Sequence, residues 1–110
     1  MTVHTNTIAA RTSGDGDTID VTSELAQIID SSGLSSGVAT LFIGGSTAGI
    51  TTIEFEPGAV SDLASVFEEI APQGRAWRHH ERWGDYNGHS HVRSALLGPS
   101  LSVPFVDGRL

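Results

Sequence analysis

The asparagine–glycine pair at positions 87 and 88 is the strongest local constraint on how this chain can fold. An Asn-Gly pair between two apolar-containing segments is the strongest short-range signal for a β-hairpin, because both residues tolerate positive φ angles. It predicts that segments 77–83 and 89–97 are paired strands, joined by the turn DYNG at residues 85–88. The last third of the chain is therefore expected to be β-structure.

Apolar periodicity and turn residues place the remaining elements in one domain. The expected strands are 3–12, 38–43, 50–55 and 101–106, the expected helices are 22–32 and 59–71, and turns are expected at 14–17 and 98–100. Thr22 is a suitable N-cap, and Gly33 is a natural C-terminal stop. Pro104 should lie at a sheet edge or a bulge, because proline cannot donate to a ladder.

The composition excludes several classes of protein. The 110 residues carry a net charge of -7, which argues against nucleic-acid binding through a basic surface. There is no cysteine, so disulfides and thiolate metal sites are excluded, and a cytoplasmic protein is expected. No membrane span or signal peptide is expected. All six positive residues are arginines, whose planar fork suits carboxylate or phosphate partners.

Four of the five histidines lie between Trp77 and Val92. On a strand, His89 and His91 would share one face, with Asp85 close by on the hairpin and His79 on the partner strand. Imidazoles with a carboxylate suit zinc or a similar divalent metal. The same groups could instead act as acid and base without a metal, or be solvated side chains of a plain hairpin.

The glycine-rich loop GGSTAG, residues 44–49, follows the expected strand 38–43. Backbone N–H groups in such a loop can form a nest for an anion. The backbone and hydroxyl groups of Gly45, Ser46, Thr47 and Ala48, together with Arg93, are the candidate phosphate ligands. An ordinary connection between two strands is the alternative interpretation.

The C-terminal segment GDYNGHSHVRSALLGPSLSVPFVDGRL resembles the signature of the YjbQ-like family, whose members are often described as secondary thiamine-phosphate synthase. The matching positions are Asp85, Asn87, His91, Leu96 to Ser100 and Val106 to Leu110. Upstream, GSTAGITTIEFEPG is similar to the HTTAG segment of the family, and Trp77 and His79 fall where the family has an aromatic-x-His. The resemblance covers residues 38–110.

This resemblance implies an α+β fold, an antiparallel β-sandwich with two helices packed on it, assembled as a homotrimer. It implies a site for a small phosphorylated metabolite or anion, with zinc or magnesium as the divalent metal. The associated transferase activity joins a hydroxymethylpyrimidine diphosphate to a thiazole phosphate. The expected roles are catalysis for His79, Asp85 and His91, ligand binding for Gly45, Ser46, Thr47, Ala48, Asn87 and Arg93, and metal binding for His79, Asp85, His89 and His91.

Two departures from the family pattern leave the activity open. Gly45 stands where the family has the histidine of HTTAG, and Ser46 stands where it has the first threonine. Family members usually continue beyond DGRL, so residues 1–110 are expected to form a single YjbQ-like domain without the usual C-terminal strand or strands. A metal- or phosphometabolite-binding trimer without catalysis, and a trimer whose histidines only pack, are the alternatives.

Overall fold

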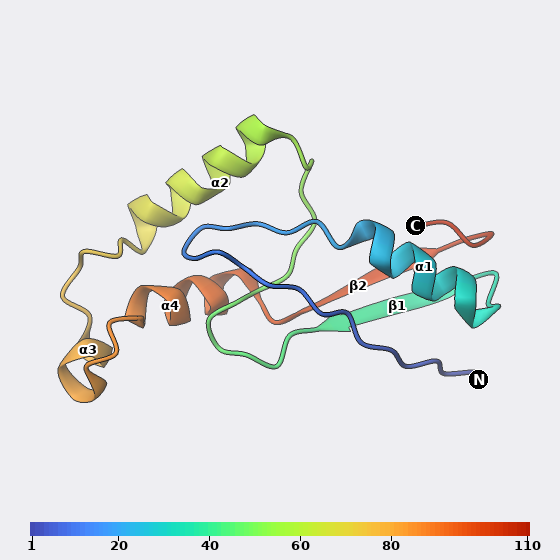
Figure 1. Ribbon diagram of the computed structural model, residues 1–110, viewed down its shortest axis with the longest axis horizontal. Helices are drawn as coiled ribbons and strands as arrows, with labels where there is room; N and C mark the ends of the chain where they lie inside the picture. The colour runs from blue at the N-terminus through green and yellow to red at the C-terminus, as the bar shows by residue number, and fades with distance from the viewer. The chain divides into compact units, whose positions relative to one another are not determined.

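The computed structural model describes residues 1–110 as four helices and a two-stranded sheet (Figure 1). The elements are α1 (Thr22–Ser32), β1 (Gly37–Phe42), α2 (Pro57–Ile70), α3 (Arg78–Trp83), α4 (Gly88–Leu97) and β2 (Ser100–Phe105). The α+β class expected from the sequence is confirmed, whereas a β-sandwich is not confirmed. None of the helices is both long and apolar enough to span a membrane.

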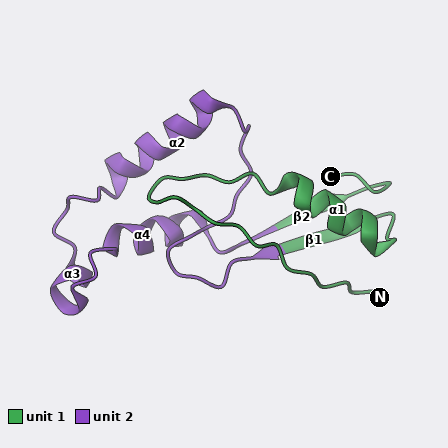
Figure 2. Ribbon diagram, viewed as in Figure 1, with its two compact units in different colours: residues 1–40, 102–110 green, residues 41–101 purple.

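The chain divides into two compact units (Figure 2). Unit 1 contains residues 1–40 and 102–110, and unit 2 contains residues 41–101. Every candidate site residue lies in unit 2.

Helix α1 of unit 1 begins and ends where local chemistry favours it. The Asp20 carboxylate accepts hydrogen bonds from the hydroxyl (2.5 Å) and the backbone N–H (2.9 Å) of Thr22, at the first turn. Gly33 ends the helix with φ 72°, a left-handed conformation that glycine adopts without steric cost. Ile29 is the buried residue of the helix. The helix expected over residues 22–32 and its stop at Gly33 are confirmed, but the N-cap is Val21, and Thr22, expected as the N-cap, is the first helical residue.

Strands β1 and β2 form an antiparallel ribbon. Gly37 lies against the ring of Phe105, and the hydroxyls of Thr40 and Ser102 are 3.2 Å apart, so partners run in opposite directions along the chain. A Cβ at Gly37 would be 3.0 Å from the Phe105 ring, which explains the small residue opposite this buried side chain. Both strands were expected within one residue of their ends.

Helix α2 of unit 2 begins with a carboxylate cap. Glu56 accepts hydrogen bonds from the backbone N–H groups of Gly58 (2.8 Å) and Ala59 (2.9 Å), and Pro57 occupies the first helical turn, where a missing N–H costs nothing. The two hydrogen bonds, that from Gly58 first, hold the pKa of the Glu56 carboxyl below its usual value. The helix starts two residues earlier than the sequence pattern suggested.

The expected hairpin of residues 77–97 is wrong, because two helices replace its strands. An Asn-Gly turn of the hairpin type needs positive φ at both residues. Here Asn87 has φ -115°, and Gly88 is the first residue of α4. The positive angles lie instead at Gly84 (69°), where α3 ends, and at Tyr86 (56°).

Two further expected strands, 3–12 and 50–55, are also wrong, since both segments are irregular. A strand needs a neighbour for its backbone groups, and neither segment belongs to the sheet. The sheet contains β1 and β2 alone, and Ile50 makes one backbone bond, from its N–H to the Gly98 carbonyl (3.0 Å). Local β-propensity did not outweigh this lack of a partner.

The Glu56 cap predicts a specific dependence of stability on pH. Because the folded pKa is lowered, the stabilisation is fully present above the unfolded value of about 4.3 and is lost as pH falls through the folded pKa. Glu56→Gln should therefore lower the melting temperature at pH 7, with a difference from wild type that shrinks toward pH 3. Thermal unfolding by circular dichroism measures this.

Asp62→Asn on the same helix is the matched control, because it also removes one negative charge but no cap. A difference between Glu56→Gln and wild type that stays constant from pH 7 to pH 3 would contradict the assignment of the stabilisation to the ionised cap.

Candidate functional site

Four polar side chains converge at the start of α4. His79 comes from α3, Asp85 and Asn87 from the following loop, and His91 from the first turn of α4. His79 Nε2 lies 3.0 Å from Asp85 Oδ1, and the His79 and His91 rings meet edge to face with centroids 4.6 Å apart. We call these four residues the histidine–carboxylate cluster. The structure thus brings together four of the residues expected from the sequence.

The side-chain amide of Asn87 is the centre of this cluster. Hydrogen bonding assigns its nitrogen to the inward position, 3.0 Å from His79 Nε2, 3.1 Å from Asp85 Oδ1 and 3.3 Å from His91 Nε2. A half-turn of the amide would put its carbonyl oxygen at the same distances from the same three atoms. Asn87 can therefore present a donor to the cluster, or complete a set of acceptors that faces a cation.

The backbone of the GGSTAG loop fixes the tautomer of His91. Nδ1 of His91 lies 3.0 Å from the carbonyl oxygen of Ser46, which can only accept a hydrogen bond. Nδ1 therefore carries the proton of the neutral ring, and Nε2 directs a lone pair at Asn87. A histidine oriented through a backbone carbonyl in this way is typical of both metal ligands and general bases.

Tyr86 holds a left-handed backbone between two members of the cluster. Its φ of 56° is uncommon for a residue with a side chain. The sequence predicted a hairpin that brings Asp85 and Asn87 together. Here the turn at Tyr86 directs both side chains toward His79. The exposed Tyr86 ring contacts His80, with centroids 5.1 Å apart.

Gly88 lets α4 begin in direct contact with Trp77. A Cβ at Gly88 would lie 2.7 Å from Cβ of Trp77 and 3.3 Å from Cβ of His79. The Gly88 N–H donates to Nε2 of His80 (3.1 Å), so that imidazole caps one of the free N–H groups at the start of the helix. His80 therefore has a structural role at the start of α4.

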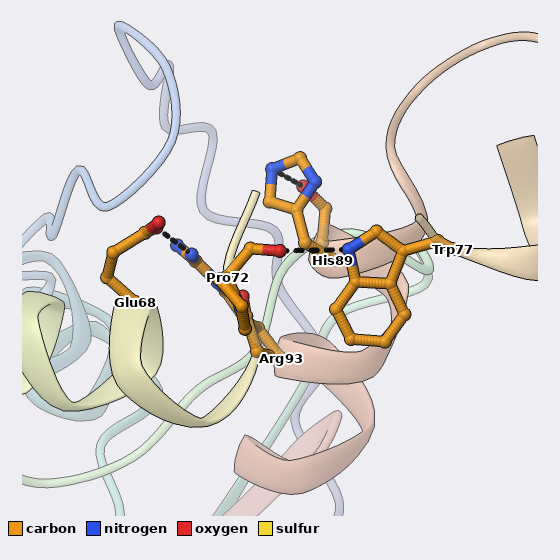
Figure 3. A network of polar contacts seen from close by, with 7 residues as sticks. Glu68, Pro72, Trp77, His89 and Arg93 are labelled. Carbon is orange, nitrogen blue, oxygen red and sulfur yellow. Dashed lines mark hydrogen bonds and ion pairs between the residues drawn. The ribbon is translucent and has the colours of Figure 1, made fainter. Parts of the chain in front are cut away.

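Arg93 and His89 belong to a separate network on α4 (Figure 3). Arg93 donates to Glu68 Oε2 (2.6 Å) and to the carbonyl of Ala71 (3.0 Å), and so joins α4 to the end of α2. Trp77 Nε1 donates to the Pro72 carbonyl (2.9 Å) in the same region. These bonds fix the segment that leads into α3.

The expectation that His89 and His91 share a face is wrong, because α4 is a helix. Two residues on a helix are separated by roughly 200° around the axis. His89 is 2% exposed, and its Nε2 lies 3.3 Å from the hydroxyl of Ser90. It is not among the side chains that converge on Asn87.

The GGSTAG loop contacts α4 through its carbonyl oxygens. Ser46 contacts His91, as described, and the carbonyl of Ala48 accepts a hydrogen bond from the hydroxyl of Ser94 (2.5 Å). Gly45 and Thr47 are exposed, and a Cβ at Gly45 would meet nothing within 4 Å. Phosphate binding by Gly45, Ser46, Thr47 and Ala48 remains a prediction, while positioning of α4 is the loop's visible contribution.

A pocket of about 400 Å³ opens beside the cluster. Its lining residues are Arg75, Ala76, Trp77, Arg78, His79, Gly88, His91 and Val92. His79 and His91 therefore face a space large enough for a small metabolite. Sequence reasoning missed Arg75 and Arg78, although the concentration of arginines around the histidines was the signal that could have found them.

No group of three or more His, Cys, Asp or Glu side chains in this structure has the geometry of a metal site. Asn87, with its carbonyl oxygen turned inward, would be a further ligand for a metal at the cluster. His89 lies apart from this set. The positions of His79, Asp85 and His91 do not by themselves form such a group, and the ligand expectation for them remains a prediction.

The fold and the site define a small α+β protein with a histidine–carboxylate cluster beside a basic pocket. A family model described as "UPF0047 protein YjbQ-like" matches residues 6–110, so the chain belongs to the YjbQ-like UPF0047 family. The resemblance seen in the sequence is confirmed.

A UPF0047 protein of Methanothermobacter thermautotrophicus is 34% identical over 110 residues, covering 100% of this chain and 76% of the relative. UPF0047 protein YugU of Bacillus subtilis is 31% identical over 106 residues, 94% of this chain and 77% of YugU.

Solved structures share the fold. A YbjQ-like protein of unknown function from Sulfolobus solfataricus superposes with a TM-score of 0.77 and 32% identity, covering 84% of this chain and 65% of that one. A YjbQ/UPF0047 family protein from Clostridium acetobutylicum gives 0.79 and 28%, covering 91% of this chain and 76% of that one. The chain thus spans about two thirds to three quarters of the length of these two structures.

The left-handed backbone of Tyr86 predicts a difference between two substitutions at that position. Tyr86→Asn and Tyr86→Val both remove the ring contact with His80, but asparagine tolerates positive φ and valine does not. Tyr86→Val should be less stable than Tyr86→Asn by about 1–2 kcal/mol. Urea unfolding of the two variants measures the difference.

The expected result holds only if the turn is retained in the folded protein. Equal stabilities for the two variants would show that residue 86 does not need the left-handed conformation in solution.

Proposed function

We propose that this chain binds a divalent metal ion through His79, Asp85 and His91, with the Asn87 carbonyl oxygen as fourth ligand, and acts there on a phosphorylated small molecule. The observation that carries the proposal is the convergence of these side chains on Asn87. The reaction proposed is that of a secondary thiamine-phosphate synthase, in keeping with the family resemblance of the sequence.

The distances from Asn87 to the other three residues are those of neighbouring ligands on one metal, although His79, Asp85 and His91 alone do not form a metal-site group. Ligands bound about 2.0–2.2 Å from a zinc or magnesium ion lie roughly 3–3.5 Å from one another. The distances from the Asn87 amide to His79, Asp85 and His91 are 3.0–3.3 Å. The Ser46 carbonyl would act as an outer partner that holds His91 in the ligating tautomer. Two imidazoles, a carboxylate and an amide oxygen suit zinc by ligand type, and magnesium is the second choice.

The chemistry needs charge neutralisation and a proton. In the proposed reaction a carbon–nitrogen bond forms between the pyrimidine methylene and the thiazole ring, and the carbon–oxygen bond to diphosphate breaks, with the electron pair leaving on diphosphate. A bound metal would supply positive charge next to the departing diphosphate. Because His79 would bind the metal through Nε2, the atom that lies 3.0 Å from Asp85, the departing diphosphate would take its proton from water.

A metal- or phosphometabolite-binding role without catalysis is the second candidate. It is favoured by Gly45, which replaces the histidine expected from the family pattern and places no side chain near the cluster. The two candidates share the metal and differ in turnover. A cytoplasmic location is part of both proposals, in keeping with the absence of cysteine.

The metal proposal predicts loss of binding at two of its ligands. His91→Ala and Asp85→Ala should each weaken Zn²⁺ affinity at least about 10-fold, because each removes one ligand of a four-ligand set. Isothermal titration with Zn²⁺, and separately with Mg²⁺, measures this. His4→Ala, an exposed histidine of unit 1, should leave the affinity unchanged.

Turnover then separates the two candidates. Formation of thiamine phosphate from the two phosphorylated precursors, abolished in His91→Ala, supports the enzyme. Metal binding without product supports the binding protein. Equal zinc affinity in wild type, His91→Ala and Asp85→Ala would refute the metal site in both.

We also propose that the chain assembles as a homotrimer. Helix α2 has no buried residue, and its Val66 and Ile70 are 48% and 55% exposed, which favours an apolar surface covered by another copy.

Light scattering of the purified protein should give three times the mass of one chain. Val66→Glu together with Ile70→Glu should shift the mass toward one chain, whereas Ser61→Glu with Ser65→Glu should not. If light scattering gives the mass of a single chain for both double variants, the proposal is contradicted.

A further inference from the structure

The pocket beside the histidine–carboxylate cluster has an unusual charge for this protein. The chain carries 13 acidic residues against six arginines, yet two of those arginines, Arg75 and Arg78, line this pocket and no carboxylate does. Such a local excess of positive charge on an acidic chain is suited to attracting an anion to one place. The remaining lining residues are two histidines and small or apolar groups, apart from Trp77.

The two pocket arginines are available to a ligand. Arg93, by contrast, is engaged by Glu68 and the Ala71 carbonyl, so its guanidinium is already used within the protein. Neither Arg75 nor Arg78 forms an ion pair with a carboxylate, and both are exposed. Their guanidinium groups keep donors that can pair with oxyanions in a bidentate manner.

Trp77 gives one of these arginines a fixed platform. The Arg75 guanidinium carbon lies 4.6 Å from the centroid of the Trp77 ring, a cation–π contact. The ring itself is held by its bond from Nε1 to the Pro72 carbonyl and by the close approach of Gly88. A stacked guanidinium loses less freedom on binding a ligand than a free one does.

We infer that Arg75 and Arg78 form the phosphate-binding subsite of this pocket, with a diphosphate group as the preferred ligand. Diphosphate carries several oxygens, which two arginine forks can share. This inference rests on the proposed function for its substrate class, and it moves the phosphate contacts from Arg93 to Arg75 and Arg78. A diphosphate in the pocket would lie next to His79 and His91, which line the same space.

The test measures anion binding without metal and without turnover. Isothermal titration in EDTA uses inorganic pyrophosphate, inorganic phosphate and succinate as probes. Wild type should bind pyrophosphate most tightly and more weakly as salt rises. Arg75→Ala and Arg78→Ala should each weaken pyrophosphate binding about 10-fold or more, since a charge-assisted hydrogen bond contributes at least that ratio.

Arg82→Ala is the matched control. Arg82 also stacks on a tryptophan, with its guanidinium 5.5 Å from the Trp83 ring, but it does not line the pocket. It should leave pyrophosphate binding within about 2-fold of wild type, a change too small for a lost contact. Arg78→Lys keeps the charge but loses the fork, and should fall between wild type and Arg78→Ala.

The inference is overturned if Arg82→Ala weakens binding as much as Arg78→Ala, if both pocket variants bind like wild type, or if succinate binds as tightly as pyrophosphate. Its failure is distinguishable from that of the proposed function. Arginine-dependent pyrophosphate binding in EDTA by a protein that binds no zinc would remove the metal proposal alone. Zinc binding that needs His91, with no arginine dependence for pyrophosphate, would remove this inference alone.

Discussion

The contact between Gly88 and Trp77 is the constraint on which the site depends. Because no side chain separates them, α4 begins directly against the residues that lead into α3, and the His80 imidazole can cap the Gly88 N–H. The same contact brings His91, one turn further along α4, within 4.6 Å of the His79 ring. The cluster is therefore assembled by packing of the backbone, and its side chains follow from that packing.

The sequence predicted those elements whose signals are local. Helix α1 ends at Gly33, β1 is a nearly continuous apolar run, and β2 lies between the turn at 98–100 and the end of the chain, so each was placed within a residue or two. The hairpin predicted for residues 77–97 was wrong because an Asn-Gly pair is compatible with two different local structures. The pair favours a hairpin when both residues adopt positive φ, but Gly88 also allows close packing, and contacts with Trp77 and His80 favour the helix.

The composition of the site was more predictable than its geometry. Residue chemistry and family resemblance singled out His79, Asp85, Asn87 and His91, and these four side chains do converge. The predicted route to convergence, a shared strand face, was wrong. Arg75 and Arg78 could have been found from the concentration of arginines around the histidines. The partners of Arg93 could not be foreseen, because they depend on how α4 lies against the end of α2, which no local pattern encodes.

The bond from His91 to the Ser46 carbonyl uses an atom that every amino acid possesses. Side-chain identity at position 46 is thus free to change while the imidazole keeps its tautomer, and the glycine at position 45 does not disturb it. What the contact does require is the number of residues between the end of β1 and Ile50, where the Ile50 N–H bonds to Gly98 after α4. Insertion or deletion of a single loop residue would shift a different carbonyl under His91. The site therefore depends on the number of residues in this loop more than on the identity of their side chains.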